Sequence, residues 1–365
     1  LHFSEMLFND ENLKSIGIKV IIIILTAISE GVMFGFSIKI RHYTDFTVEG
    51  MHKKYSSYDR LSAKEKAQID MQKLMDIERV LDSATLRQIT HKGSKEPDEE
   101  LDKLIGLNNV KKSVKEMAAR MEYETKFKKK NKKVQPISSM HMCFLGPPGT
   151  GKTTVARIMT GILYRYKYIR KNQCIEIDGN FLKGNSPGET SKKTSLLIKK
   201  ALGGVLFIDE AYALLEDTQE GYGQEAIATI VKEMEDNKDD IIIILAGYEN
   251  EMKKLINSNP GLYSRIKTYL WFESYSIEEL GMIFNFMANN EEFYVTLETL
   301  EKFKSLISKD ICKKNFGNAR TVRNYLDKII DKHAYNIING NIDSKMLYTL
   351  CPEDVIIQQK EDIFI

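Results

Sequence analysis

Three short apolar runs stand out in the middle of the chain, at residues 140–145, 205–208 and 241–245, and only His141 interrupts them. Short apolar runs without polar alternation are typical of strands that are buried on both faces, as in a parallel sheet. After the first run, apolar positions recur with helical spacing from Thr154 onward. The pattern therefore predicts an α/β domain in which helices sandwich a parallel sheet, and we place this domain at residues 99–275.

The residues before this domain form a separate region of the sequence. Apolar positions at helical spacing between residues 62 and 89 predict one or two amphipathic helices. The following stretch, residues 91–98, contains the glycine, serine and proline that are typical of a linker. We therefore expect an N-terminal region at 1–60, and a helical segment with a linker at 61–98.

The most apolar stretch of the chain lies within this N-terminal region and allows two interpretations. Segment 16–38 is long enough for a membrane-spanning helix, which needs about 20 apolar residues. Lys19 and Glu30 oppose a span, because a charge near the bilayer centre costs about 2.5 to 3.5 kcal/mol on insertion scales. A buried strand at residues 20–25 explains the run of isoleucines as well. A membrane anchor at 16–38 is therefore the alternative to a cytoplasmic protein.

Composition and charge say little about which class of partner the protein binds. The 53 basic and 51 acidic residues leave a formal net charge of +2, which by itself indicates neither a nucleic-acid surface nor an anionic membrane. Six lysines lie within residues 126–133, but a solvated helix end explains so short a run better than a nucleic-acid patch does. The four cysteines do not have the spacing of metal ligands, which favours reduced thiols in a cytosolic protein. These cysteines are Cys143, Cys174, Cys312 and Cys351.

A glycine-rich motif of the form GxxxxGK[ST] follows the first apolar run directly. Its residues are Gly146, Pro147, Pro148, Gly149, Thr150, Gly151, Lys152 and Thr153. The glycines let consecutive backbone N–H groups face a phosphate, and the helix that follows, with Thr154 at its start, adds its positive end. Lys152 supplies a charge for the β and γ phosphates, and the Thr153 hydroxyl is suited to hold Mg²⁺. The order of strand, loop and helix therefore predicts a site for ATP and Mg²⁺.

Two carboxylates, Asp209 and Glu210, follow the second apolar run directly. The carboxyl end of a strand in an open parallel sheet is where ligand-binding groups gather. There, Asp209 would orient a water bound to Mg²⁺, and Glu210 would act as general base on the attacking water. The pair therefore predicts hydrolysis of ATP as well as binding.

Two arginines follow turns further along the chain. Arg265 comes shortly after Asn259, Pro260 and Gly261, and Arg320 stands at a predicted helix start. The planar guanidinium group suits a phosphate, because it can donate two hydrogen bonds at once. From spacing alone, a surface ion pair is the simpler interpretation of either arginine.

Several further motifs accompany the glycine-rich loop. They are Leu104-Ile105-Gly106-Leu107, His141-Met142, Gly203 to Tyr212, Tyr222-Gly223-Gln224-Glu225-Ala226-Ile227, Ile244 to Tyr248, Asn259-Pro260-Gly261 with Ser264-Arg265-Ile266, and Asn318 to Asn324. Together these motifs resemble the CbbX and stage V sporulation protein K branch of AAA+ ATPases. The resemblance covers residues 101 to about 339. It implies a helical lid, which we place at 276–350, and this leaves residues 351–365 as a C-terminal tail.

The resemblance also implies an assembly and several residue roles. It implies a homo-oligomeric ring, usually a hexamer, with ATP at each boundary between subunits. On this basis Arg265 is the arginine finger that reaches the γ-phosphate of a neighbouring subunit. Arg320 is the sensor 2 arginine of the lid, and Ile105 and Gly106 lie against the adenine.

Two segments depart from the pattern of related proteins. The broad AAA+ pattern has a polar sensor 1 residue at the tip of the third strand, whereas this chain has Ala246, Gly247 and Tyr248, so we assign no sensor 1 residue. Red-type Rubisco activases of this branch carry an aromatic residue in a pore loop, whereas this chain has Ser186 and Pro187 in the matching segment. The sequence therefore gives no support for threading of a polypeptide.

These observations predict a Mg²⁺-dependent ATPase that remodels a protein partner. One alternative is a nucleotide-gated scaffold or assembly factor with slow hydrolysis, held on a membrane or a partner by its N-terminal region. The missing pore-loop aromatic favours that alternative. A nucleic-acid remodelling ATPase is a third interpretation, which rests only on the lysine run at 126–133.

Overall fold

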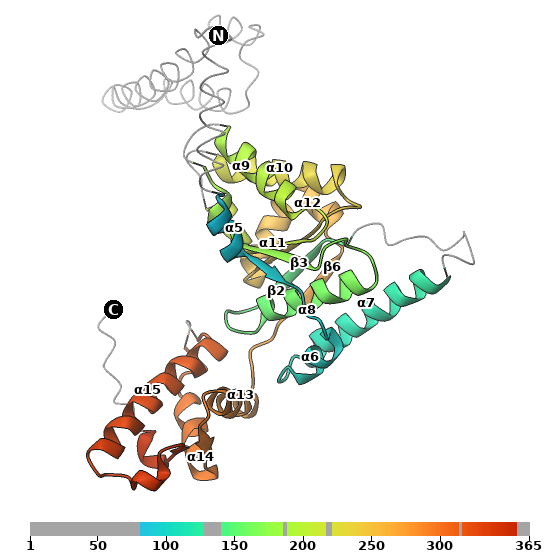
Figure 1. Ribbon diagram of the computed structural model, residues 1–365. Helices are drawn as coiled ribbons and strands as arrows, with labels where there is room; N and C mark the ends of the chain where they lie inside the picture. The colour runs from blue at the N-terminus through green and yellow to red at the C-terminus, as the bar shows by residue number, and fades with distance from the viewer. Residues whose placement is uncertain (1–80, 128–139, 185–187, 217–220, 314–315, 356–365) are drawn as a thin grey trace, which may run out of the picture. The chain divides into compact units, whose positions relative to one another are not determined.

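A six-stranded sheet lies at the centre of the α/β domain (Figure 1). The computed structural model describes residues 81–127, 140–184, 188–216, 221–313 and 316–355. In spatial order, the strands are β1 (Thr90–Lys92), β3 (Gln173–Asp178), β4 (Val205–Asp209), β5 (Ile242–Gly247), β2 (Met142–Leu145) and β6 (Thr268–Trp271). All neighbouring pairs from β3 to β6 are parallel, which confirms the predicted parallel sheet.

The predicted linker at residues 91–98 is wrong, because this stretch contains part of an edge strand and the start of a helix. Thr90–Lys92 form β1, which pairs antiparallel with β3 and follows the short helix α5 (Ser83–Ile89). Helix α6 (Pro97–Lys103) then begins inside the same stretch. A strand of three residues is too short to show an alternating pattern, and a proline is favoured in the first turn of a helix as much as in a linker.

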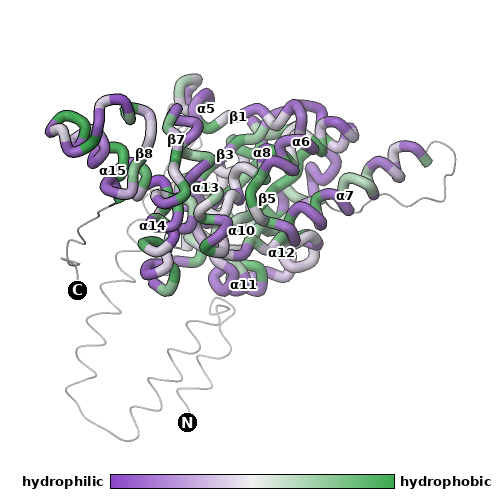
Figure 2. The backbone as a smooth tube through the Cα atoms, turned by 90° about the horizontal axis from the view of Figure 1, so that it is seen from below, coloured by the Kyte–Doolittle hydropathy of each residue, from purple (hydrophilic) through white to green (hydrophobic). Residues whose placement is uncertain are grey.

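Helices cover both faces of the sheet (Figure 1). Alternate residues of the parallel strands face opposite layers. Cys143 and Leu145 of β2 face the layer of α9 (Glu189–Ala201), α10 (Tyr222–Asp236), α11 (Glu249–Ser258) and α12 (Pro260–Arg265). Met142 and Phe144 face the layer of α6, α7 (Asn108–Phe127) and α8 (Lys152–Arg165). Figure 2 shows the resulting contrast between the hydrophobic β5 and the largely hydrophilic α7. Burial on both faces explains why the strands appear as unbroken apolar runs.

His141 precedes β2 and is part of the core. Its side chain is buried, its Nδ1 accepts a hydrogen bond from the backbone N–H of Ile243 at 3.1 Å, and its Nε2 lies 3.4 Å from the carbonyl oxygen of Met234. Burial lowers the pKa of His141 to about 4, so the ring is neutral near pH 7. A neutral ring with Nε2 protonated satisfies both contacts, which gives His141 a structural role.

The expected helical lid follows the α/β domain. Its helices are α13 (Ile277–Asn290), α14 (Leu297–Ile307) and α15 (Ala319–Ile338), and a small parallel sheet joins β7 (Tyr294–Val295) to β8 (Thr349–Leu350). Ser276 and Glu279 form a capping box that starts α13, in which each side chain bonds the backbone N–H of the other residue. Phe284 of α13 stacks on Phe303 of α14, with 4.0 Å between the ring centroids.

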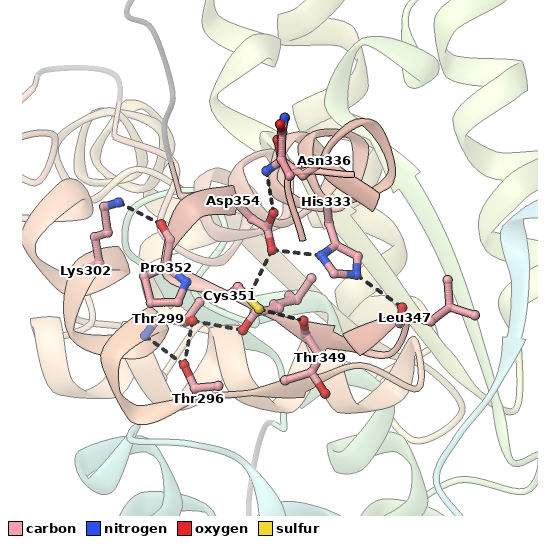
Figure 3. Close-up of polar contacts among 12 residues, drawn as sticks. Thr296, Thr299, Lys302, His333, Asn336, Leu347, Thr349, Cys351, Pro352 and Asp354 are labelled. Atoms are coloured by element: carbon pink, nitrogen blue, oxygen red, sulfur yellow. Dashed lines mark hydrogen bonds and ion pairs between the residues drawn. The ribbon is translucent and has the colours of Figure 1, made fainter. Parts of the chain in front are cut away.

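Residues after Leu350 belong to the lid, which corrects the predicted tail at 351–365. A short 3₁₀ helix, Pro352–Asp354, packs on α15, and Val355 is buried in the lid core. Asp354 is fully buried and accepts hydrogen bonds from His333 Nδ1, from Asn336 Nδ2 and from the backbone N–H of Cys351, each at 2.8 Å (Figure 3). The lid therefore extends at least to Val355, because these contacts need the residues beyond the last strand.

Four sequence predictions fall wholly or mostly on residues that the structure does not describe. They concern the apolar segment 16–38, the predicted helices at 62–89 up to residue 80, the pore-loop residues Ser186 and Pro187, and most of the lysine run at 126–133. Within the described parts of the chain, the structure contains no helix with the length and apolar character of a membrane span.

We expect Asp354→Ala to destabilise the lid, because it leaves the buried His333 and Asn336 without their shared acceptor. A buried hydrogen-bonding group that loses its partner costs about 1 to 3 kcal/mol, so the free energy of opening of α15 should fall by at least that amount. Hydrogen exchange of the α15 amides measures this change. The control is Glu353→Ala, since Glu353 is the exposed neighbouring carboxylate. Equal protection of α15 in both variants would contradict the prediction.

Candidate active site

The glycine-rich loop connects β2 to α8 and curls around an open space. Gly149 and Gly151 have φ angles of 68° and 89°, in the left-handed region that favours glycine. The Gly146 N–H donates to the carbonyl oxygen of Gly247 on β5 at 3.1 Å, which ties the loop to the neighbouring strand. A Cβ atom at Gly149 would overlap the carbonyl oxygen of Gly317, so the lid leaves no room for a side chain there. The loop therefore has the form that the motif predicts.

Lys152 occupies the first position of α8 beneath this loop. Its side chain is buried, and its ammonium group donates to the carbonyl oxygens of Gly146 at 2.9 Å and Pro147 at 2.8 Å. Burial lowers the pKa of Lys152 from its ordinary value, whereas the charge of Asp209 acts in the opposite direction. The loop carbonyls thus hold the ammonium group in place until a stronger acceptor, such as a phosphate, replaces them.

Asp209 and Glu210 lie at the carboxyl end of β4. The Asp209 carboxylate accepts a hydrogen bond from the Glu210 N–H at 3.0 Å, which orients the turn after the strand. Glu210 has a φ of 46°, an uncommon conformation for a residue with a side chain. Its carboxylate is exposed to the same open space that the glycine-rich loop encloses.

A cavity of about 330 Å³ brings these groups together. It is lined by the glycine-rich loop, the start of α8, the ends of β4 and β5, and residues of the lid. The lining comprises Gly146, Pro148, Gly149, Gly151, Lys152, Thr153, Thr154, Asp209, Glu210, Tyr212, Gly247, Tyr248, Met287, Ala319, Arg320 and Arg323. The predicted phosphate-binding and catalytic groups, except Arg265, Ile105 and Gly106, therefore lie in or beside a single cavity.

The first turn of α15 is attached to the glycine-rich loop. The Ala319 N–H donates to the carbonyl oxygen of Gly149 at 3.1 Å, and the Asn318 side-chain amide donates to that of Pro148 at 3.2 Å. These contacts place the exposed side chain of Arg320 at the cavity. Among the described residues, the Arg320 guanidinium makes no ion pair or hydrogen bond, so its donors are available to a ligand.

Five sequence-predicted residues lie outside the cavity lining, namely Pro147 and Thr150 of the glycine-rich loop and three residues from other segments. Ile105 packs against the lid core, and Gly106 lies beside the Glu279 side chain at the start of α13. Arg265 ends α12, where its Nη2 donates to Glu235 of α10 at 2.9 Å. This contact is the surface ion pair that spacing alone suggests, and Arg265 does not contribute to the cavity of its own chain.

Six lining residues have no assigned role in the sequence-based prediction: Tyr212, Gly247, Tyr248, Met287, Ala319 and Arg323. Tyr212 and Tyr248 follow β4 and β5, and their ring centroids lie 5.7 Å apart. Burial raises the pKa of the Tyr212 phenol, so its hydroxyl remains a neutral donor at physiological pH. Met287 and Arg323 come from the lid helices α13 and α15. The two tyrosines could have been found from the sequence, because each ends a motif that follows a predicted strand. No local sequence pattern distinguishes Met287.

The residues at the cavity fit a nucleotide with a divalent cation. Glycine backbone, a buried ammonium group and the start of a helix are the groups that bind phosphates. Thr153 and Asp209 supply the hydroxyl and carboxylate oxygens that Mg²⁺ prefers. The donor set thus matches the ATP and Mg²⁺ that the sequence predicts.

Comparisons with known proteins agree with this geometry. Residues 142–274 match the family model described as "ATPase family associated with various cellular activities (AAA)", and residues 276–363 match the AAA lid domain. Protein CbbX of Cereibacter sphaeroides is 40% identical over 268 residues, which cover 72% of this chain and 86% of the relative. The chain belongs to the AAA ATPase family. It is thus an ATPase of the CbbX-like branch, as the motifs predict.

One further relative of this AAA ATPase and one solved structure of similar fold are informative. A chloroplastic ribulose bisphosphate carboxylase/oxygenase activase of Cyanidioschyzon merolae is 40% identical over 263 residues, covering 71% of this chain and 89% of the relative. The crystal structure of the FIGL-1 AAA domain superposes with a TM-score of 0.52 at 18% identity, over 77% of this chain and 86% of that one. The second similarity concerns the fold alone.

We expect Lys152→Ala to abolish nucleotide binding by this AAA ATPase, because the glycine-rich loop loses its buried positive charge. Titration calorimetry with AMP-PNP and Mg²⁺ measures the loss. Lys193→Ala is the matched control, since Lys193 is also partly buried but lies on α9 and outside the cavity. An unchanged AMP-PNP affinity in Lys152→Ala would show that the loop does not bind phosphate.

Proposed function

We propose that this AAA ATPase hydrolyses ATP with Mg²⁺, as part of a ring of identical chains, and uses the energy to remodel a protein partner. The observation that supports this proposal most strongly is the single cavity that combines Lys152, Asp209, Glu210 and Arg320. Phosphate-binding groups alone would only hold a nucleotide. A carboxylate exposed at the same cavity adds the base that hydrolysis needs.

In this proposal the residues of the cavity have separate tasks. Lys152 binds the β and γ phosphates, and Glu210 accepts the proton of the attacking water. Thr153 and Asp209 hold Mg²⁺, which neutralises charge that develops on the phosphates. Arg320 brings a positive charge from the lid, so that closure of the lid and binding of the phosphates are coupled.

Arg265 supports the proposal of an oligomer. Its side chain is 25% exposed and pairs with Glu235, outside the cavity of its own chain. Glu235 is 54% exposed, and a pair with one exposed partner contributes little to stability, so Arg265 can exchange Glu235 for another anion. We propose that this anion is the γ-phosphate in the cavity of a neighbouring subunit, where Arg265 stabilises charge in the transition state.

The protein partner is proposed from the relatives. The Cyanidioschyzon merolae relative is named as an activase of ribulose bisphosphate carboxylase/oxygenase, which is itself a protein. We propose that this chain likewise acts on a folded protein, and that its ATPase part is cytoplasmic, since all four cysteines are free. A nucleotide-gated scaffold is the second candidate, because Ser186 and Pro187 replace the pore-loop aromatic.

We expect Glu210→Gln to retain AMP-PNP binding and to slow ATP turnover by about two to four orders of magnitude, the range for loss of a general base. Phosphate release measures turnover. Glu216→Gln is the matched control, because Glu216 is an exposed carboxylate six residues later and outside the cavity. Turnover near the wild-type rate in Glu210→Gln would exclude Glu210 as the base.

The same variant separates the two candidate functions. A remodelling enzyme needs turnover, so Glu210→Gln with ATP should hold its partner without releasing it in an altered form. A scaffold needs only bound ATP, so the variant should assemble its partner as well as the wild type does.

We expect Arg265→Ala to bind ATP but to hydrolyse it poorly, and mixing with Lys152→Ala to restore part of the activity. In a mixed ring some sites combine the intact loop of an Arg265→Ala subunit with the intact Arg265 of a Lys152→Ala subunit. The measurement is phosphate release as a function of the mixing ratio, with co-assembly checked by differently tagged chains. No recovery in rings that contain both chains would remove Arg265 from the active site.

A further inference from the structure

Arg323 is a second arginine of the lid that lines the cavity. It lies three residues after Arg320 on α15, and residues at this spacing share one face of a helix. The first turn of α15 is fixed to the glycine-rich loop through Ala319 and Asn318, so this face is fixed relative to the phosphate-binding groups. Both arginines therefore project from one rigid helix toward the same space.

Two carboxylates hold the Arg323 guanidinium. Its Nη2 donates to Glu291 at the end of α13 at 2.8 Å, and its Nε lies 3.1 Å from Asp327, one turn further along α15. The side chains of Arg323, Glu291 and Asp327 are 46%, 43% and 53% exposed, respectively. Ion pairs this exposed contribute little to stability. Two carboxylates at separate positions nevertheless restrict the directions that the guanidinium can face.

The orientation leaves donors for a ligand. A guanidinium has five N–H donors. The hydrogen bond to Glu291 uses one of the donors on Nη2, and Nε lies 3.1 Å from the Asp327 carboxylate in an ion pair. The remaining three donors and the planar shape suit a phosphate oxygen pair. A guanidinium with remaining donors at the wall of this cavity can bind a phosphate there, which a residue that only forms a surface ion pair would not do.

We propose that Arg323 contacts a phosphate of the bound nucleotide, and that Glu291 and Asp327 are positioning residues that aim it. This inference rests on the proposed ATPase function and extends it, because the lid then recognises the nucleotide through two arginines. Glu291 belongs to α13 and Arg323 to α15, so the nucleotide is linked to the packing of both lid helices.

The test compares the affinities of variants for AMP-PNP by titration calorimetry with Mg²⁺. We expect Arg323→Gln to raise the dissociation constant about tenfold, the effect of losing charge-assisted hydrogen bonds. Glu291→Gln and Asp327→Asn keep the guanidinium and should weaken binding less. Arg170→Gln is the matched control, because Arg170 is also exposed and bonded to a carboxylate, Asp240, but lies outside the cavity.

Inorganic tripolyphosphate distinguishes a phosphate contact from one to the ribose or base. It carries the phosphates alone, so Arg323→Gln should also weaken its competition with AMP-PNP. Hydrogen exchange of α13 and α15 reports any loosening of the lid, which Arg323→Gln and Glu291→Gln should cause equally. A purely structural Arg323 would instead give both variants the same AMP-PNP affinity.

Three results would overturn the proposal: wild-type AMP-PNP affinity in Arg323→Gln, the same loss of affinity in Arg323→Gln and Glu291→Gln, or unchanged competition by tripolyphosphate. Failure of the proposed function looks different, because the wild-type chain itself would then not bind AMP-PNP.

Discussion

The side-chain amide of Asn318 joins the glycine-rich loop, the start of the lid and the segment between the two domains. Its Nδ2 donates to the carbonyl oxygen of Pro148 at 3.2 Å, and its Oδ1 accepts from the Tyr275 N–H at 3.0 Å. Asn318 is fully buried and has φ 49° and ψ −122°, a sparsely populated conformation for a residue with a side chain. The position needs a side chain that both donates to Pro148 and accepts from Tyr275. Aspartate lacks the donor and glycine lacks the side chain, whereas asparagine supplies both groups.

The contacts of the Asn318 side chain determine which lid residues line the cavity. Because Asn318 precedes α15 directly, fixing its side chain fixes the first turn of the helix against Gly149. Tyr275 adds a second connection, since its hydroxyl donates to the carbonyl oxygen of Thr150 at 3.2 Å. A movement of the glycine-rich loop must therefore move the helix that carries Arg320 and Arg323. The same contacts that build the site can transmit a change in the nucleotide to the lid.

The sequence predicts those parts of the structure whose cause is local. The glycine-rich loop, Asp209 and the buried strands each follow from a short pattern, and the structure places them together. Strand β1 was not predictable, because its three residues gain their conformation from pairing with β3. The predicted end of the lid was wrong because Asp354 acts through the distant His333. The role of Arg265 stays a prediction, since its proposed ligand belongs to another subunit.

The position of Glu210 depends on its surroundings more than on its own preference. Its left-handed conformation costs on the order of 1 to 3 kcal/mol and persists only where neighbouring structure enforces it. Its carbonyl oxygen accepts from the Ala213 N–H at 2.9 Å, and a Cβ atom at Gly179 would lie only 2.7 Å from that oxygen. The absent side chain of Gly179 thus lets β3 and β4 approach closely enough to hold the turn. The backbone packing at the carboxyl ends of β3 and β4 therefore keeps Glu210, the proposed general base, at the cavity.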